Sequence, residues 1–274
     1  MAGSVGILAG GGELPGLLIE ACRAGGREPF VIAFNGFTEP QAIAGARHAW
    51  VDIAAVGKTF RTLREAACES VVMAGKFKRP SLSSLRPDAR GLKVIARVAT
   101  AGGDDAVLRV LIDELEGEGF RVVGADDLLK DLIATPGALG SVRPTDEHRA
   151  DIARGIKVAR ALGDVDVGHS VVVQQNIVLG VEAAEGTDAL LRRCADLRRD
   201  GRPGVLVKLR KRQQERRADL PVIGPETVAG VRDAGLAGIA FEADGTLVIG
   251  RARLIEAANT AGVFVYGLGP AEVG

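Results

Sequence analysis

The chain opens with a short apolar run, three glycines and a helix-spaced apolar segment, and this order restricts its fold more than any other feature. The run SVGILAG ends in glycines 10–12, LPGLLIEACRAGG follows at helical spacing, and PFVIAF is the next apolar run. This order is typical of a doubly wound α/β domain, in which loop N–H groups and a helix N-terminus face an anion. The loop lacks the full dinucleotide fingerprint and a Walker lysine. It therefore predicts either a phosphate or nucleotide contact or a plain tight turn, rather than a classical NAD or ATP site.

Apolar runs and helical segments keep alternating along the chain and divide it into two predicted domains. The alternation predicts a Rossmann-like, doubly wound N-terminal domain at residues 1–132. Two prolines and two glycines predict a linker at residues 133–147. Residues 148–274 again mix strands and helices, which predicts a C-terminal α/β domain. Near its start we expect a helix capped by Thr145 or Asp146, followed later by a hairpin with a polar turn at residues 174–176.

Three charged residues of the first domain lie where such a fold binds ligands. Lys76 comes just after the strand SVVMAG, at the carboxyl end where open α/β sheets bind their ligands, and a solvated basic loop is the alternative interpretation. Asp104 and Asp105 follow two glycines at the start of a predicted helix. One of the two carboxylates can complement the helix dipole, which leaves the other to meet a ligand.

Charge balance and the scarcity of Cys and His exclude several classes of function. With 35 basic and 35 acidic residues the formal charge is zero, so no overall attraction to nucleic acid or to an anionic membrane is expected. Three widely separated cysteines predict reduced thiols in a cytoplasmic protein. We expect neither a signal peptide nor a transmembrane helix. The three histidines are too scattered for a zinc site, and no nucleophile motif is present.

Most of the candidate chemistry lies between residues 171 and 221. Glu182, Glu185 and Asp188 follow one apolar segment, whereas a second, GVLVK, leads into the cationic stretch 208–217 and then Asp219. Carboxylates beside such cations can hold a hard cation and a polyphosphate in one place. Ordinary helix-start carboxylates and an exposed basic loop are the alternative interpretation.

Five sequence blocks extend over nearly the whole chain: GILAGGGELP, AGKFKRPSL, AGGDDAVLR, VEAAEGTDALLRR, and VLVK with the later DLP. Together they resemble the LpxI-type UDP-2,3-diacylglucosamine pyrophosphatases of lipid A synthesis. The resemblance implies a Rossmann-like domain, a C-terminal α/β catalytic domain of unusual topology, and a homodimer. It also implies Mg²⁺-dependent hydrolysis of UDP-2,3-diacylglucosamine, bound between the domains, to UMP and 2,3-diacylglucosamine 1-phosphate, which is lipid X.

The resemblance also implies roles for individual residues. Asp219 would be the essential acidic residue, as a metal ligand or a group that orients water, with Lys208 as its catalytic partner and Asp188 as a second metal ligand. The remaining family positions would contact substrate: Gly11, Gly12, Lys76, Asp104, Asp105, Glu185, Gly186, Thr187, Lys211, Gln214 and Arg217. The family pattern Lys-Pro-x-Gln-Asp-x-Arg is changed here, because Arg212 replaces Pro and Glu215 replaces Asp.

Two other classes of function stay open on the residues alone. A non-catalytic protein that binds a nucleotide sugar or a lipid would use the same loops without needing Asp219. A dinucleotide-dependent oxidoreductase would use the first glycine loop, but it should have an acidic residue where this chain has Asn35. A lipid product also implies transient contact with the inner face of the membrane, whereas the 4% of aromatic residues argues against nucleic-acid binding.

Overall fold

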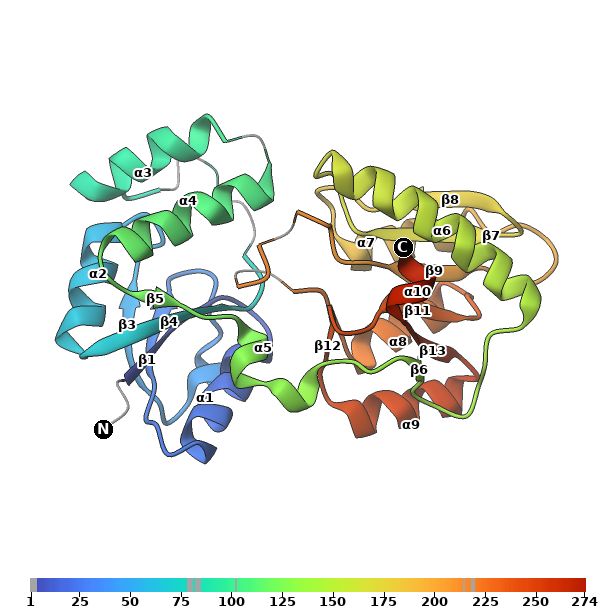
Figure 1. The fold of residues 1–274 in the computed structure, drawn as a ribbon, viewed down its shortest axis with the longest axis horizontal. Helices are drawn as coiled ribbons and strands as arrows, with labels where there is room; N and C mark the ends of the chain where they lie inside the picture. The colour runs from blue at the N-terminus through green and yellow to red at the C-terminus, as the bar shows by residue number, and fades with distance from the viewer. Residues whose placement is uncertain (1–3, 78–80, 82–84, 102, 214, 218–219) are drawn as a thin grey trace. The chain divides into compact units, whose positions relative to one another are not determined.

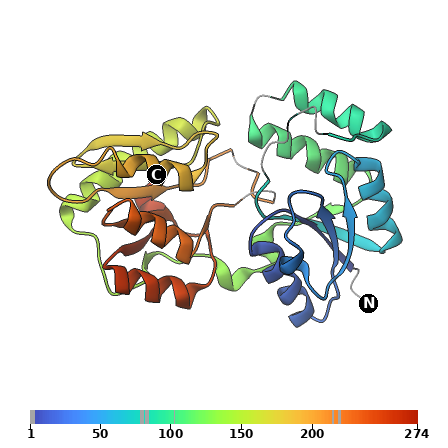
Figure 2. The same cartoon turned by 180° about the vertical axis from the view of Figure 1, so that it is seen from behind.

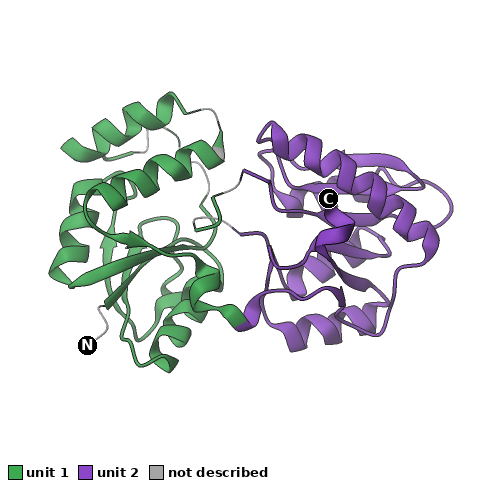
Figure 3. Cartoon of the chain, in the orientation of Figure 1, with its two compact units in different colours: residues 1–130, 215–219 green, residues 131–214, 220–274 purple. Residues whose placement is uncertain are grey.

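A computed structural model describes residues 4–77, 81, 85–101, 103–213, 215–217 and 220–274. The chain forms two compact units, shown in Figure 3. Unit 1 consists of Met1–Lys130 together with Glu215–Asp219, and unit 2 of Asp131–Gln214 together with Leu220–Gly274. Residues 133–147, expected as a linker, therefore belong to unit 2, and a short piece of the expected C-terminal domain belongs to unit 1.

Unit 1 has the predicted doubly wound architecture. Its five strands form a parallel sheet in the order β3-β2-β1-β4-β5. They are β1 (Ser4–Ala9), β2 (Phe30–Phe34), β3 (Arg47–Val51), β4 (Cys68–Ala74) and β5 (Arg121–Val122). The helices are α1 (Leu14–Ala24), α2 (Val56–Glu65), α3 (Ala89–Ala99), α4 (Asp104–Gly117) and α5 (Ala125–Leu128), with the 3-10 turn η1 (Pro40–Ile43).

Helices cover both faces of this sheet, which explains its apolar strands. Figures 1 and 2 show α1 and α5 on one face and α2, α3 and α4 on the other. Strands buried on both faces carry near-continuous apolar runs instead of an alternating pattern. β2 is such a strand, because Val31, Ile32 and Ala33 are all fully buried. The Rossmann-like prediction for the first domain is confirmed.

Unit 2 contains a mixed six-stranded sheet in the order β6-β13-β11-β9-β7-β8. Its strands are β6 (Gly137–Ala138), β7 (Ser170–Gln174), β8 (Ile177–Val181), β9 (Val205–Lys208), β11 (Gly238–Glu242) and β13 (Phe264–Leu268). The central strands β9, β11 and β13 are parallel, whereas β6, β7 and β8 each pair antiparallel with a neighbour. A separate parallel pair is formed by β10 (Val222–Ile223) and β12 (Leu247–Val248).

The two faces of the second sheet form two apolar cores. Helix α6 (Asp146–Asp164) and the short α10 (Pro270–Val273) contribute to one, with Val171 and Val207 of the sheet. Helices α7 (Thr187–Ala195), α8 (Pro225–Asp233) and α9 (Arg251–Ala261) contribute to the other, with Val172 and Leu206. Successive strand residues point to opposite faces, so neighbouring valines serve different cores. A further 3-10 turn, η3 (Lys130–Leu132), lies where the chain first passes from unit 1 to unit 2.

The predicted hairpin between β7 and β8 is anchored by a buried carboxylate from α6. Gln175 and Asn176 adopt left-handed φ values of 51° and 62°, as tight hairpin turns require. Their N–H groups donate to Asp151 over 3.1 and 2.6 Å, and Arg202 pairs with the same carboxylate. Burial by itself would raise the pKa of Asp151, but these donors lower it below its ordinary value. Asp151 therefore stays ionised and connects α6 to the hairpin.

Thr145 is the N-cap of α6, and its contribution to the stability of the protein can be measured. Its hydroxyl accepts the His148 N–H, and its own N–H donates to His148 Nδ1 over 3.2 Å. Because the side chain of alanine cannot accept a hydrogen bond, Thr145→Ala should lower the free energy of unfolding by about 1 kcal/mol, measured by urea denaturation. Thr145→Ser keeps the acceptor and should remain close to the parent. Equal destabilisation by both substitutions would contradict this capping role.

Candidate functional site

The glycine loop of unit 1 lies at the switch point of the sheet, where β1 is flanked by β2 and β4. The loops after β1 and β4 pair with each other in an antiparallel bridge between Gly11 and Lys76. Gly11 N–H donates to the Lys76 carbonyl over 3.0 Å, and Lys76 N–H donates to the Gly11 carbonyl over 2.9 Å. The structure thus brings the predicted residues Gly11 and Lys76 together at the carboxyl ends of the strands, where α/β sheets bind ligands.

Close approach of the two loops explains most of their glycines. A Cβ at Gly10 would lie 2.8 Å from the Lys76 carbonyl oxygen, and one at Gly75 would lie 2.6 Å from the Gly11 oxygen. Gly12 differs, because its φ is +89° and no described atom lies within 4 Å of the place of its Cβ. Of these glycines, Gly12 is the one with room beside it for a ligand.

Phe77 adds an aromatic ring to this edge. It is 41% exposed, and its ring lies 5.8 Å from Phe34 and 5.7 Å from Phe37, between ring centroids. Its Cε2 is 2.8 Å from where a Cβ of Gly10 would be, so the ring lies against the glycine loop. Phe77 has no signal in the sequence, because one aromatic residue in a basic loop forms no motif.

Asp105, at the start of α4, has both carboxylate oxygens in protein contacts. Oδ2 accepts from Arg109 Nε over 2.8 Å, and Oδ1 accepts the backbone N–H of Glu215 over 2.6 Å. Asp104 is the first residue of α4, but its side chain lies outside what the structure describes. Of the two carboxylates considered from sequence, Asp105 is thus the one seen to fix another segment of the chain.

In unit 2, β8 and β9 end at the same edge of the sheet because the antiparallel strand β7 lies between them. Glu182 follows β8, and its N–H donates to the Ser170 carbonyl over 2.8 Å. Ser170 is in turn the register partner of Lys208, the last residue of β9. Three strands therefore place a carboxylate, a hydroxyl and an ammonium group side by side.

These residues and the start of α7 form the buried polar cluster, defined as His169, Ser170, Glu182, Thr187 and Lys208. Thr187 Oγ1 donates to Glu182 Oε1 over 3.0 Å, and Lys208 Nζ donates to Thr187 Oγ1 over 3.1 Å. Glu182 and Lys208 are only 5% and 7% exposed. A carboxylate and an ammonium group buried this deeply, and linked through Thr187 at the carboxyl ends of β8 and β9, are typical of a functional site.

The charge state of Glu182 follows from its neighbours. Burial alone would raise its pKa, but His169, Lys208 and the hydroxyls of Ser170 and Thr187 lower it below the ordinary value. Its Oε1 is bonded to Thr187, whereas Oε2 has no hydrogen-bond partner among the described residues and lies 3.5 Å from His169 Nε2. The carboxylate therefore stays charged and balances Lys208.

The other predicted residues of unit 2 are more peripheral. Glu185 pairs with Arg193 over 2.7 Å, Gly186 is the N-cap of α7 with φ of +80°, and Asp188 is exposed in the first turn of that helix. Lys211 pairs with Asp166 over 2.6 Å. Of the cations expected as one phosphate-binding group, Lys211 is thus already paired within its own unit.

Arg217 also has acidic partners, and two predicted residues fall outside the described ranges. Arg217 contacts Glu116 and Glu215 within unit 1. Gln214 and Asp219 lie outside the described residues. Within the described ranges, no three or more His, Cys, Asp or Glu side chains are grouped so as to hold a metal ion.

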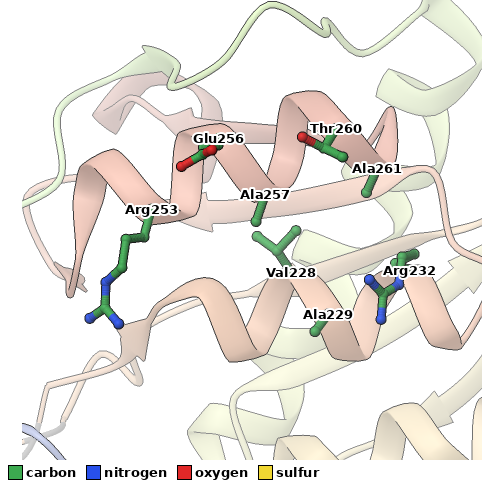
Figure 4. Close-up of a pocket in the computed structure, with 8 residues that line it drawn as sticks. All are labelled: Val228, Ala229, Arg232, Arg253, Glu256, Ala257, Thr260 and Ala261. Carbon is green, nitrogen blue, oxygen red and sulfur yellow. The ribbon is translucent and has the colours of Figure 1, made fainter.

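A shallow groove in unit 2 lies away from these residues. It has a volume of about 370 Å³ and runs between α8 and α9, as Figure 4 shows. Val228, Ala229, Ala257 and Ala261 form its apolar floor, with charged residues such as Arg253 beside them. None of the predicted site residues lines this groove, so it is not the candidate active site.

Comparison with known proteins identifies the family. A model of the LpxI N-terminal domain matches residues 4–132, and a model of the LpxI C-terminal domain matches residues 135–266. The chain belongs to the LpxI family. The UDP-2,3-diacylglucosamine pyrophosphatase LpxI of Caulobacter vibrioides is 45% identical over 276 residues, which cover 98% of each chain. The resemblance inferred from the five sequence blocks is confirmed.

The LpxI sequence blocks did not point to every residue of the site. Glu182 lies inside one of these blocks but has no role implied by the resemblance, and no motif marks His169, because the three histidines lack the spacing of a zinc site. Strand register identifies both residues, since His169 directly precedes the start of β7 and Glu182 directly follows the end of β8, at the edge where β9 ends with Lys208. Glu116 and Asp126 gave no sequence signal either, although both contact the segment that leads to Asp219.

Proposed function

We propose that this chain hydrolyses the pyrophosphate of UDP-2,3-diacylglucosamine to UMP and 2,3-diacylglucosamine 1-phosphate. The observation that carries the proposal is the 45% identity to a UDP-2,3-diacylglucosamine pyrophosphatase over 98% of both chains. The buried polar cluster supports it, because one ammonium and two hydroxyl groups at a strand edge suit phosphate oxygens.

The proposed chemistry divides between Asp219 and Lys208. Hydrolysis forms one P–O bond to a water oxygen and breaks one P–O bond of the anhydride, while negative charge grows on the leaving phosphate. Asp219 orients the water, and the Lys208 ammonium neutralises the leaving phosphate. Thr187 and Glu182 hold that ammonium in place through the 3.1 and 3.0 Å bonds at Thr187 Oγ1.

The proposed substrate contacts come from both units. We assign Gly12 and Lys76 of unit 1 and Gly186, Thr187 and Lys208 of unit 2 to the substrate. The same proposal extends to most of the remaining positions that the family resemblance named, Gly11, Asp104, Glu185, Lys211 and Gln214. Asp105 and Arg217, which contact other protein groups, are instead proposed to act indirectly. Glu185 and Lys211 already have their charges balanced by ion pairs within the protein, which favours an indirect role for these two residues.

Magnesium is proposed as the cofactor, but the buried polar cluster does not itself fit it. Glu182 is balanced by Lys208 and lies beside His169, so a dication there would meet like charge. Magnesium usually binds through one or two carboxylates together with substrate phosphates. Asp219 and Asp188 are the proposed ligands, and the metal would supply further neutralisation of the phosphates when bound.

UMP release should depend on a divalent cation. The purified chain with Mg²⁺ and UDP-2,3-diacylglucosamine is expected to release UMP, and an excess of chelator should reduce the rate at least tenfold until Mg²⁺ is restored. The measurement is chromatographic quantification of UMP over time. Binding of the substrate without any UMP release would indicate a binding protein and contradict the proposed hydrolysis. UMP release that is insensitive to chelator would contradict only the metal requirement.

Two further properties are proposed from the family resemblance. We propose a homodimer, to be measured by sedimentation, and transient contact with the membrane surface during product release, to be measured by vesicle flotation. No helix in the described part of the chain has the length and apolar character needed to cross a bilayer.

A further inference from the structure

Residues 215–217 come from the C-terminal half of the sequence but pack on unit 1. They lie inside the stretch that matches the LpxI C-terminal domain, yet Glu215–Asp219 belongs to the same compact unit as Met1–Lys130. The chain passes between the units at residues 130–131, 214–215 and 219–220. Segment 215–217 thus belongs to the C-terminal half of the sequence but packs as part of unit 1.

Three carboxylates of unit 1 bind this segment, one for each of its residues. Asp105 Oδ1 accepts the Glu215 N–H, Asp126 Oδ2 accepts from Arg216 Nε, and Glu116 Oε1 accepts from an Arg217 guanidinium N–H, each over 2.6 Å. Asp105 and Glu116 lie on α4, whereas Asp126 lies on α5. Two different helices therefore fix three consecutive residues.

The segment also has a defined internal geometry. Glu215 accepts from Arg217 at both of its oxygens, over 3.0 Å at Oε1 and 3.1 Å at Oε2. Such a bidentate pair sets the orientation of both side chains. Asp105 and Asp126 are buried, with side chains 9% and 8% exposed. The charge of Asp126 is compensated by Arg216 of the segment, whereas Asp105 pairs with Arg109 and receives the Glu215 N–H as a further donor.

We propose that Asp105, Glu116 and Asp126 are positioning residues that hold segment 215–217 on unit 1 and thereby place Asp219 for catalysis. Asp219 follows Arg217 by two residues, a reach of at most about 7 Å of extended chain, so anchoring Arg217 restricts where the carboxylate can go. The inference rests on the proposed function, because it takes Asp219 as essential. It gives Asp105 and Arg217 an indirect role in place of the direct substrate contact expected from the resemblance.

The first test replaces Asp126 and compares kinetics with a matched variant. Asp126→Asn weakens the pair with Arg216, and kcat should fall roughly tenfold or more with little change in KM, because misplacement by about 1 Å can cost 100-fold. Exchanging the charges, with Asp126→Arg and Arg216→Asp together, should recover part of kcat. The matched control is Glu118→Gln, which removes ion pairs with Arg64 and Arg90 in the same unit and should leave kcat unchanged.

A second pair of variants separates positioning from substrate contact at Asp105. Asp105→Asn keeps an oxygen that can accept the Glu215 N–H, whereas Asp105→Ala does not. We expect most of kcat in the first variant and a strong loss in the second. Equal loss in both would show that the charge itself is needed, as in direct contact with the substrate or a metal, and would overturn the positioning role.

The third measurement needs no substrate. Hydrogen exchange of a peptide spanning residues 210–221 should become faster in Asp126→Asn than in the parent or in Glu118→Gln. Unchanged exchange together with unchanged kcat would overturn the inference, as would a rise of KM at constant kcat. If the parent chain releases no UMP, the proposed function is contradicted. Hydrogen exchange of the 210–221 peptide would still test whether the carboxylates hold segment 215–217.

Discussion

Replacement of Asp219 by alanine is expected to lower the rate of UMP release by about 10²- to 10⁴-fold, the usual range for a residue that orients or deprotonates a nucleophile. Without the carboxylate, water is no longer directed at phosphorus, and one proposed magnesium ligand is lost. The measurement is the initial rate with UDP-2,3-diacylglucosamine and Mg²⁺ for the parent and for Asp219→Ala. Thermal unfolding of both proteins checks that the fold is kept.

Two controls make the Asp219 result specific. Asp219→Asn keeps the size of the side chain and should be impaired nearly as much, because the charge is what the role requires. Asp200→Ala removes an exposed aspartate of unit 2 and should behave as the parent. Activity of Asp219→Ala within threefold of the parent would rule out Asp219 as the essential acidic residue.

Lys208→Met is expected to damage both catalysis and stability. Loss of a preorganised donor to a developing phosphate charge usually costs about 10²- to 10³-fold in kcat. The same change removes one of the two cations that lower the pKa of Glu182 and takes away the Nζ donor to Thr187, so the free energy of unfolding should fall by up to about 3 kcal/mol. Initial rates and urea unfolding at neutral pH measure the two effects separately.

The double variant Lys208→Met with Glu182→Gln distinguishes these two effects. Removing both charges leaves no uncompensated ion, so most of the lost stability should return while activity stays low. Recovery of activity along with stability would mean that Lys208 acts only through the fold. If stability does not return in the double variant, the stability lost in Lys208→Met does not come from the uncompensated charge of Glu182.

Acid pH should narrow the stability gap between the parent and Lys208→Met. In the parent the pKa of Glu182 lies below its ordinary value of 4.5, so its contribution is present above that pH and lost as pH falls through the lower folded value. Without Lys208 one of the two cations that lower this pKa is lost, so the folded-state pKa of Glu182 should be higher in the variant than in the parent. The variant should then take up a proton at a higher pH than the parent and lose less stability as pH falls, which urea unfolding between about pH 6 and pH 3 would detect.

Local patterns along the chain are sufficient to predict several features of this fold. The apolar runs and the glycine loop predicted the doubly wound first unit, and Thr145 was named as a possible cap of α6 from its type and place alone. The turn at Gln175 and Asn176 followed from polar residues between apolar runs. These signals are short in range, because caps, turns and strand periodicity are set by residues close in the chain.

Only the tertiary structure decided which distant residues share a site. Glu182 lies beside Lys208 because β7 is inserted between β8 and β9, an arrangement that no spacing along the chain encodes. Residues 137–138, expected in a linker, form β6 because β13 offers an open edge for antiparallel pairing. Segment 215–217 lies on unit 1 because three carboxylates 90 to 110 residues earlier in the chain, of which Asp105 and Asp126 are buried, accept hydrogen bonds from it. Long-range pairing and charge compensation are properties of the folded chain, and here they place the residues on which the proposed chemistry depends.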